Sequence, residues 1–311
     1  MGGADTALRH VARSLALDLA TGEVVGALTR AGIESLLLRG PAVARLYPDG
    51  EARPYVDVDL LVAPGDERRA GAVLAALGFA QVVEDEELRG HRPLHAHEWL
   101  RSRDGAAVDL HRSLSGVGVP PCEVWRALSA GPEAITVGRV ATRVPSAAAT
   151  ALAVALHAAH HGPGRAQSLR DLEVAVERLP LQTWQAAAAL GARLAALPSL
   201  AAGLRLLPAG AELAGRLALA EAVPVAVALR ASGAPPLALG LDWLLETQGS
   251  RAKVALLLRT LAPTPGALRS WRALARRRRY GLLAAYLSHP FWLARHAVPS
   301  VAAVVRARRS S

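Results

Sequence analysis

Two kinds of hydrophobic pattern occur along the chain, and the change between them falls near residue 145. Before this point, short apolar runs with a two-residue period predict strands, and stretches with a 3.6-residue period predict helices. Glycine, proline and aspartate mark the turns between them. The predicted strands cover residues 33–38, 56–62, 79–83, 95–100, 106–111 and 134–144. The predicted helices cover two segments within residues 1–31, a turn after Gly40, residues 66–77 and residues 122–129.

Two connections and the later half of the chain complete this pattern. Residues 84–92 are charged and predict an exposed loop, and Arg103-Asp104-Gly105 predicts the turn of a hairpin. Helix and strand alternation followed by hairpin pairing favours a mixed sheet with helices packed on it. From Pro145 the apolar spacing is helical almost to the end. We therefore predict an α+β fold, with a mixed-sheet domain over residues 1–144 and a mostly α-helical domain over residues 145–311.

Two aspartates interrupt the predicted strand Val56-Asp57-Val58-Asp59-Leu60-Leu61-Val62. Because side chains alternate along a strand, Asp57 and Asp59 project from one face while the apolar side chains are buried on the other. Neighbouring carboxylates repel and lose hydration inside a fold, and a hard divalent cation relieves this. Mg²⁺ favours one or two protein carboxylates together with substrate phosphates. The pair indicates metal-assisted phosphoryl or nucleotidyl transfer; the alternative is an exposed strand whose acids face water.

Other residues could complete such a site. Asp109, in the strand Ala106-Ala107-Val108-Asp109-Leu110-His111, could add a third carboxylate from an adjacent strand, although a single acid in a strand is also an ordinary surface residue. Gly40 follows a buried strand, where backbone N–H groups could meet a phosphate or simply form a turn. Arg39 and Arg53 fit neutralisation of triphosphate charge, or are surface charges.

Residues 33–62 and 104–114 resemble the nucleotidyltransferase fold related to DNA polymerase β, and most closely the bacterial uncharacterised nucleotidyltransferase family. The family's ordered motifs appear here as Leu38-Arg39-Gly40, then Arg53, then Asp57-Val58-Asp59-Leu60-Leu61-Val62, and later Val108-Asp109-Leu110-His111. A related layout occurs in antitoxin-linked nucleotidyltransferase toxins, with Lys-Gly-Gly where this chain has Arg39-Gly40-Pro41. The Gly-Ser pair of many polymerase β relatives is absent.

The resemblance implies roles for the motif residues. Asp57, Asp59 and Asp109 would hold Mg²⁺ or Mn²⁺, and Asp109 would also accept the proton of the attacking hydroxyl. Arg39, Gly40 and Arg53 would contact the nucleotide. The resemblance also implies an NTP co-substrate, with ATP among the candidates, and release of pyrophosphate.

A histidine-rich segment, His157-Ala158-Ala159-His160-His161, lies on a predicted helix, where His157 and His161 share a face. This spacing could ligate zinc, but the chain lacks the Glu of a His-Glu-x-x-His motif and a cysteine pair. The family resembled has a similar helix followed by Arg and Leu-x-x-Asp-Leu, here Arg165 and Leu169-Arg170-Asp171-Leu172. We interpret His157, His161 and Asp171 as a polar seam that contacts nucleotide or acceptor, or that makes structural hydrogen bonds.

Several other functions are excluded by missing motifs. The chain has no P-loop, no dinucleotide-binding Gly-x-Gly-x-x-Gly after a strand, and no Gly-x-Ser-x-Gly elbow of a hydrolase. Cys122 is the only cysteine, so no intramolecular disulfide forms and a reducing compartment fits. Charges interrupt the first thirty residues, so we expect no secretory signal and a cytoplasmic protein. Arg, His or Pro interrupts the apolar stretches at residues 186–203 and 280–294, so we expect no membrane span.

The net charge of +10 is concentrated at the C-terminal end. After Glu246 the chain has thirteen Arg or Lys and no acid, with a run from Arg276 to Arg279. Such a segment could lie on anionic lipid, bind RNA or cover an acidic partner, or it could be a solvated basic face of packed helices.

Together these features predict a metal-dependent nucleotidyltransferase that moves an NMP from an NTP to a hydroxyl acceptor. Relatives of the family resembled suggest a small-molecule or peptide hydroxyl in natural-product or polysaccharide biosynthesis. Two alternatives stay open: an RNA- or tRNA-modifying, toxin-like enzyme, and a non-catalytic nucleotide-binding or scaffold protein.

Overall fold

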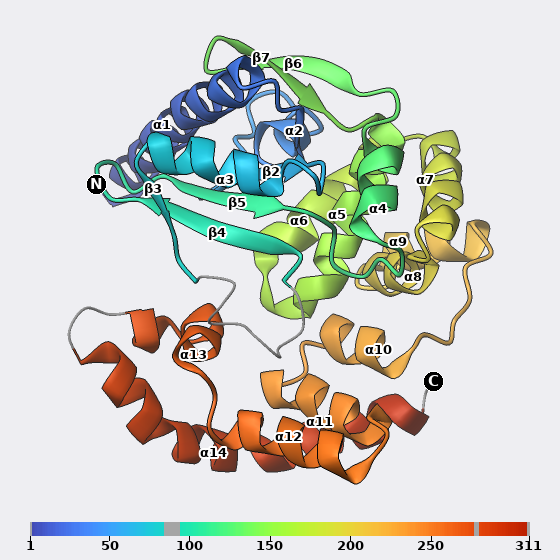
Figure 1. The fold of residues 1–311 in the computed structure, drawn as a ribbon. Coiled ribbons are helices and arrows are strands. Elements are labelled where there is room, and N and C mark those ends of the chain that lie inside the picture. The colour runs from blue at the N-terminus through green and yellow to red at the C-terminus, as the bar shows by residue number, and fades with distance from the viewer. Residues whose placement is uncertain (1, 84–93, 277–279, 310–311) are drawn as a thin grey trace.

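A computed structural model describes residues 2–83, 94–276 and 280–309, and Figure 1 shows its helices and strands. The elements before residue 145 are α1 (Gly2–Arg30), β1 (Ser35–Leu37), α2 (Pro41–Ala44), β2 (Val58–Val62), α3 (Glu67–Ala76), β3 (Phe79–Gln81), β4 (Ala96–Arg101), β5 (Ala107–His111), α4 (Pro121–Leu128), β6 (Glu133–Val137) and β7 (Val140–Val144). The elements after it are α5 (Ala147–His161), the short 3-10 helix η2 (Gly162–Gly164), α6 (Ala166–Arg178), α7 (Leu181–Arg193), α8 (Leu197–Leu204), α9 (Pro208–Arg216), α10 (Val225–Ala231), α11 (Pro236–Glu246), α12 (Ser250–Leu261), α13 (Pro265–Trp271), η3 (Ala273–Arg276) and α14 (Gly281–Arg309).

The main sheet has five strands in the order β1-β2-β5-β4-β3. Strands β2 and β5 run parallel, and the other neighbours are antiparallel. The predicted hairpin joins β4 to β5, where Gly105 has a positive φ of 71° and donates its N–H to Arg101 O at 2.9 Å. The mixed sheet and its helices confirm the predicted α+β class.

The alternation of side chains along β2 decides what each face of the sheet does. Val58, Leu60 and Val62 are buried in one core together with side chains of α1 and α3. Leu61 points to the opposite face and shares a second core with α5. Asp59 lies at an alternate position with Leu61, so its carboxylate belongs to the face toward α5. The sequence thus places the acids on the side of the sheet that the helical layer covers.

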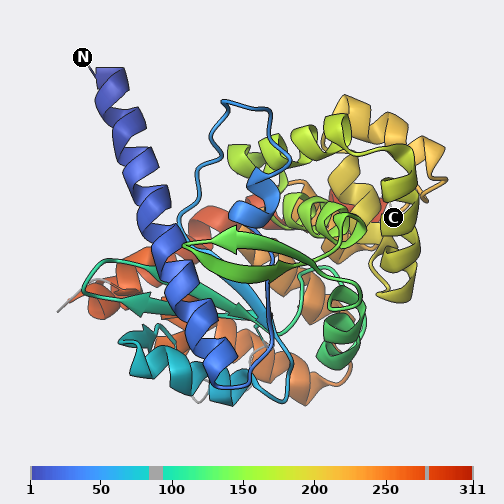
Figure 2. The same ribbon diagram turned by 90° about the horizontal axis from the view of Figure 1, so that it is seen from above.

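Helices α5 to α9 pack beside the sheet, on the right in Figure 1 and the upper right in Figure 2. The central helix, α5, is buried along most of its length. Gly203 of α8 allows the closest approach to it, because a Cβ there would lie only 2.1 Å from Ala155 O. Leu36 and Leu38 from the sheet side share one core with Leu152 and Leu156 of α5. The core therefore continues across residue 145, and the domain boundary there stays a prediction.

The last helices, α10 to α14, occupy the lower part of the molecule in Figure 1. They enclose two small cores, one around Leu229 and Val304 and one around Leu268 and Ala285. Arg276 connects this region to the main sheet, because its Nη1 donates to Glu98 of β4 at 2.8 Å. Across the described residues, no helix combines the length and the apolar character that crossing a bilayer requires.

The N-terminal prediction of two helices is wrong, because α1 runs without interruption over Gly2–Arg30. Gly22 does not break the helix but allows the hairpin of β6 and β7 to pack against it, since a Cβ at this position would lie 2.8 Å from Gly138 O. The predicted stop at Gly32 is confirmed by its positive φ of 69°.

The alternating run at residues 134–144 forms the hairpin of β6 and β7 rather than one strand. Gly138 and Arg139 both have positive φ, 54° and 68°, as a two-residue hairpin turn requires. The predicted helices at 66–77 and 122–129 are confirmed as α3 and α4. The predicted loop at residues 84–92 lies outside the described residues.

Candidate active site

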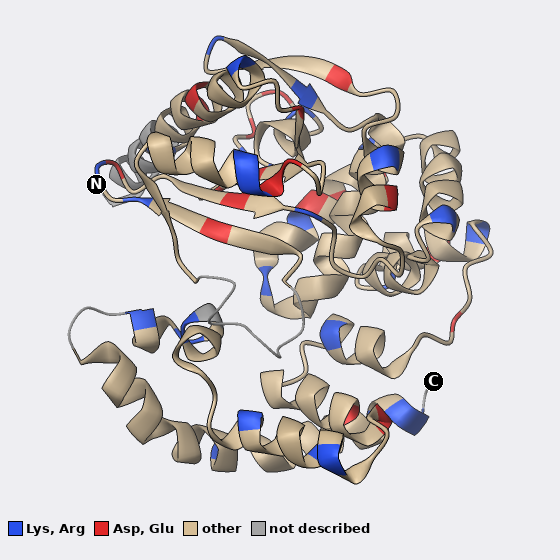
Figure 3. Ribbon diagram, in the orientation of Figure 1, with Lys and Arg blue, Asp and Glu red and all other residues tan. Residues whose placement is uncertain are grey.

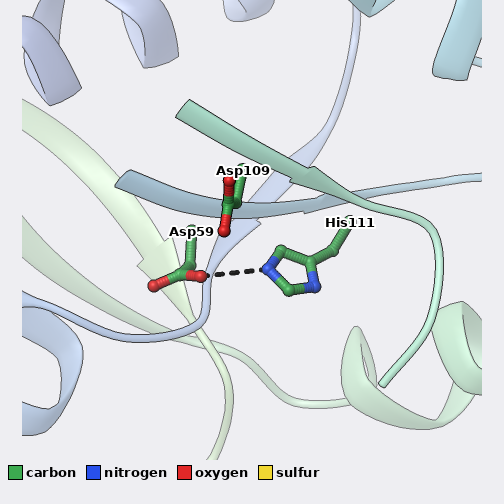
Figure 4. Close-up of side chains that lie close together, drawn as sticks. All are labelled: Asp59, Asp109 and His111. Atoms are coloured by element: carbon green, nitrogen blue, oxygen red, sulfur yellow. Dashed lines mark hydrogen bonds and ion pairs between the residues drawn. The ribbon is translucent and has the colours of Figure 1, made fainter. Parts of the chain in front are cut away.

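Parallel pairing of β2 with β5 brings the predicted carboxylates of two strands together. Asp59 lies directly opposite Asp109 in the register, and His111 is on the same face of β5 two residues further on. Figure 4 shows the three side chains converging, with His111 Nε2 at 3.0 Å from Asp59 Oδ1. One ligand atom from each of Asp59, Asp109 and His111 lies within 4.8 Å of the others, as a metal site requires. Carboxylate oxygens and an imidazole nitrogen together fit a divalent cation.

Asp57 stands at the bend immediately before β2 and lines the same cavity as Asp59 and Asp109. Burial and the neighbouring charge of Asp59 raise the pKa of Asp57. Burial and the same charge raise the pKa of Asp109 to about 6. Both carboxyl groups therefore resist ionisation as the site stands, and a bound cation would favour their ionised forms.

Asp59 behaves in the opposite way because it has two positive or donor partners. Burial alone would raise its pKa, but the charges and hydrogen bonds of Arg39 and His111 outweigh burial and hold the pKa well below the usual range. Arg39 donates from Nη2 to Asp59 Oδ1 and its Nη1 lies 3.1 Å from Nε2 of His157. Arg39 is therefore an internal counter-ion to the carboxylates as well as a residue that lines the cavity.

Arg53 and Asp171 form a buried ion pair in the wall of the cavity. Arg53 donates from Nε and Nη2 to the two carboxylate oxygens of Asp171, at 2.7 and 2.6 Å. The hydroxyl of Tyr47 donates to Asp171 Oδ1 at 2.6 Å, and Gln167 Nε2 donates to the same oxygen at 2.9 Å. These contacts join α6 to the segment that leads into β2. Arg53 and Asp171, which are both predicted to contact ligand, are therefore also structural partners of each other.

Gly40 begins the short helix α2 with a positive φ of 61°. A Cβ at this position would lie 3.5 Å from the ring of Tyr55, whose hydroxyl donates to Asp18. Gly40 lines the cavity together with Arg39 and Tyr55. The geometry agrees with a turn that brings backbone close to a ligand, and the phosphate contact stays a prediction.

Five histidines surround the same cavity, which has a volume of about 340 Å³. His157 and His161 of α5 have ring centroids 4.5 Å apart, and His95 lies 5.5 Å from His160 and 5.7 Å from His111. Burial, helped by neighbouring positive charges, lowers the pKa of His95 to about 3 and of His160 and His161 to about 4. These imidazoles are therefore neutral at pH 7 and can accept or donate hydrogen bonds to a ligand.

The structure brings all nine predicted site residues to one cavity, and it adds others that the prediction left out, among them His95, His111, Ser115 and His160. The nine are Arg39, Gly40, Arg53, Asp57, Asp59, Asp109, His157, His161 and Asp171. His111 was within reach of the sequence, because the motif Val-Asp-Leu-His places it two residues after Asp109 on one strand face. His95, Ser115 and His160 meet only through the tertiary fold; Ser115 Oγ lies 2.7 Å from His160 Nδ1. The alternative in which His157 and His161 ligate zinc is not supported, because the candidate metal cluster among the described residues consists of Asp59, Asp109 and His111.

Comparison with known families decides the class of protein. The sequence model of one family, described as "Uncharacterised nucleotidyltransferase", matches residues 5–212 of the chain. The chain belongs to the uncharacterised nucleotidyltransferase family. The match includes the sheet, the carboxylates and helices α5 to α8, and it confirms the resemblance seen in the motifs.

Two solved structures are similar to this nucleotidyltransferase at low identity. The antibiotic-resistance factor ANT(2'')-Ia, which has substrate-regulated conformation dynamics, is 16% identical, with 60% of this chain and 96% of that chain covered and a TM-score of 0.43. An antigenic nucleotidyltransferase-like protein from Paracoccidioides brasiliensis is 15% identical, with 59% and 91% covered and a TM-score of 0.33. No curated protein matches the chain.

Proposed function

We propose that this nucleotidyltransferase is a metal-dependent enzyme that transfers an NMP from an NTP to a hydroxyl acceptor and releases pyrophosphate. The observation that carries the proposal is the pairing of Asp59 and Asp109 across β2 and β5, with Asp57 and His111 beside them in one cavity. The raised pKa values of Asp57 and Asp109 support a cation site, because a bound cation would favour the ionised forms of both carboxyl groups.

The residues fit a divalent ion, Mg²⁺ or Mn²⁺, held by Asp57, Asp59 and Asp109 with His111 as a further donor. The ion would offset the charge that develops on the attacking and leaving oxygens. Asp109 would accept the proton of the acceptor hydroxyl, because its carboxylate lines the cavity and would be ionised with a cation bound. The acceptor oxygen forms a bond to the α-phosphorus as the bond from that phosphorus to the pyrophosphate oxygen breaks.

The positively charged side of the cavity would hold the triphosphate. Arg39 and Arg165 line it, and Gly40 supplies a close backbone approach. Arg53 and Asp171 would shape this wall through their own ion pair, and the neutral His157 and His161 would orient nucleotide or acceptor. We favour a small-molecule or peptide acceptor, because the cavity volume of about 340 Å³ is in the range of small-ligand sites. A cytoplasmic, biosynthetic role is part of the proposal.

The test is incubation of the purified protein with each α-labelled NTP and Mg²⁺, alone, with total RNA and with a small-molecule extract. Label that enters a small product or peptide, and that disappears when EDTA is added, supports the proposal. Label in RNA supports the second candidate, an RNA-modifying enzyme, which the thirteen basic residues after Glu246 favour. NTP binding without transfer to any acceptor in these mixtures would instead favour a nucleotide-binding protein.

A further inference from the structure

Helix α14 carries a stripe of exposed apolar side chains along almost its whole length. Phe291 and Val298 are each 77% exposed and Leu287 is 67% exposed. The exposed positions are spaced three, four or seven residues apart, so they lie on one side of the helix. We call this set the α14 stripe; it consists of Leu283, Leu287, Phe291, Val298, Val301 and Val305.

The opposite side of α14 is apolar as well, and the part of the chain that the structure describes covers only that side. Ala303 and Val304 are buried against α10 and α11, and Ala285 is buried against α13 and η3. A helix that is apolar on both sides is normally covered on both sides. With 29 residues, α14 is about 40 Å long, so the uncovered stripe is too extended to be the scattered exposure of an ordinary surface.

Helix α12 continues this apolar surface. Val254, Leu257, Leu258 and Leu261 are between 46% and 59% exposed and share one side of the helix. The end of α12 contacts α14, because His289 Nε2 lies 2.8 Å from Thr260 O. Both helices lie at the lower edge of the molecule in Figure 1, away from the sheet.

The charged side chains of α12 and α14 are all basic. No acid occurs after Glu246, exposed Arg295 lies within the α14 stripe, and Arg306, Arg308 and Arg309 lie at its C-terminal end, where Arg308 also pairs with Asp242 of α11. Figure 3 shows the left arm of α14 without charged residues. Arg251, Lys253 and Arg259 flank the exposed leucines of α12. Exposed apolar side chains with basic residues among and beside them match a surface that is apolar inside and negative outside.

We propose that α12 and the α14 stripe bind the surface of an anionic lipid bilayer, with the helices lying in the plane of the headgroups. Apolar side chains enter the boundary of the acyl chains while Arg and Lys pair with lipid phosphates. RNA fits less well, because its phosphates and bases make no favourable contacts with a row of exposed Leu and Val side chains. A second copy of the chain also fits less well, because two basic helices without acids repel each other.

The test is co-sedimentation of the full chain with vesicles of phosphatidylcholine alone or mixed with phosphatidylglycerol. We expect binding to the anionic vesicles, and at least about tenfold weaker binding to the neutral ones. The double variant Leu287→Glu/Phe291→Glu should lose at least about tenfold in binding to the anionic vesicles. Leu15→Glu/Leu19→Glu is the matched control, because these exposed leucines of α1 have the same spacing and should leave binding unchanged.

Circular dichroism on each variant confirms that the fold is kept before binding is compared. Equal loss of vesicle binding in the two double variants would overturn the proposal, and so would absence of binding by the unaltered chain. RNA binding measured by fluorescence anisotropy that exceeds vesicle binding, and that Leu287→Glu/Phe291→Glu leaves unchanged, would also overturn it. A dimer that this variant converts to a monomer without vesicle binding would assign the face to a second copy instead. None of these measurements needs NTP, so the proposal stands or falls separately from nucleotidyl transfer.

Discussion

Asp59 is ionised in a buried position because Arg39 and His111 contact it, while no described residue gives Asp57 or Asp109 a comparable hydrogen bond. The pKa of Asp59 is therefore lowered and the pKa values of Asp57 and Asp109 are raised within one cluster. Full ionisation of all three carboxylates needs more positive charge than Arg39 alone provides. This imbalance is the electrostatic argument for a cation site, and it gives two predictions at the level of single side chains.

The first prediction concerns Asp57, at the bend before β2, and Asp59 within the strand. Asp57→Asn and Asp59→Asn should each lower nucleotidyl transfer by about 10³-fold or more, because an amide neither neutralises nor binds the cation as a carboxylate does. Rates with α-labelled NTP measure the loss. Asp49→Asn, in an exposed turn, is the matched control and should keep full activity. Transfer that persists in the double variant Asp57→Asn/Asp59→Asn would remove these residues from the mechanism.

The second prediction concerns how Asp109 makes the stability of the metal-free protein depend on pH. Its folded pKa of about 6 lies above the value of 3.8 for an unperturbed carboxyl group, so the folded state binds more protons than the unfolded state between these values. The contribution of Asp109 to the free energy of unfolding should therefore fall as pH rises from about 4 to about 6 and stay low above it. The buried histidines, whose pKa values are lowered, contribute in the opposite direction, so only a comparison with an Asp109 variant isolates this effect.

Asp109→Asn removes this penalty. In EDTA at pH 7.5 the variant should be more stable than the unaltered protein by about 1–3 kcal/mol, and the difference should vanish near pH 4. Urea denaturation at the two pH values measures it. A stability difference that does not depend on pH would show that ionised Asp109 carries no such penalty.

The site residues differ in how far the sequence could identify them. Alternation along two strands placed Asp57, Asp59 and Asp109 on one face, because a strand's period is local. His95 and His160 could not be found this way, since they are 65 positions apart and meet only when α5 packs beside β4. The pairing of Arg53 with Asp171 was equally hidden, because each residue alone reads as a surface charge.

At the level of elements, the position of α5 in the core depends on one close contact with α8. Gly203→Ala should destabilise the fold by about 2–4 kcal/mol, because its Cβ would lie 2.1 Å from the backbone oxygen of Ala155 and neither backbone can yield without shifting a helix. Gly215→Ala, on α9, meets no atom within 4 Å and should instead stabilise by about 0.5–1 kcal/mol. Thermal and urea denaturation compare them. Equal effects would show that the α5–α8 contact is not tight.

Two neighbouring ion pairs join α6 to the segment before β2, and they differ in burial. Asp171→Ala should cost about 3–5 kcal/mol, because it leaves the buried guanidinium of Arg53 without a counter-charge. Glu51→Ala breaks the exposed bidentate pair with Arg170 and should change stability little. Urea denaturation measures both. A Michaelis constant for NTP that rises in the folded Asp171→Ala enzyme would show a ligand role beyond the structural one, and little loss of stability would argue against the structural one.

Element types were easier to predict than their limits and their number. Strands and helices with long periodic patterns, such as α3 and β2, were predicted close to their observed bounds. The prediction of two helices failed at α1, which is continuous over Gly2–Arg30 and in which Gly22 allows a close contact with Gly138. A glycine that lets another backbone approach and a glycine that ends a helix look the same in one sequence, and only the fold distinguishes them.

At the level of the whole molecule, the hydrophobic core indicates which parts of the chain fold together. Leu36, Leu38 and Leu61 of the sheet are buried against α5, whose side chains come from beyond residue 145. The family match likewise runs on to residue 212. Residues 1–144 expressed alone would expose one full face of the sheet to water, whereas residues 1–221 would keep both faces covered.

We therefore expect residues 1–221 to be folded and monodisperse, and residues 1–144 to aggregate or to lack a cooperative unfolding transition, because a sheet with one bare apolar face has lost about half of its buried area. Size-exclusion chromatography and thermal melting followed by circular dichroism measure this. The full chain is the control. Cooperative unfolding of residues 1–144 would establish the boundary near residue 145 as a true domain boundary and would reduce the shared core to an interface between two domains that fold independently.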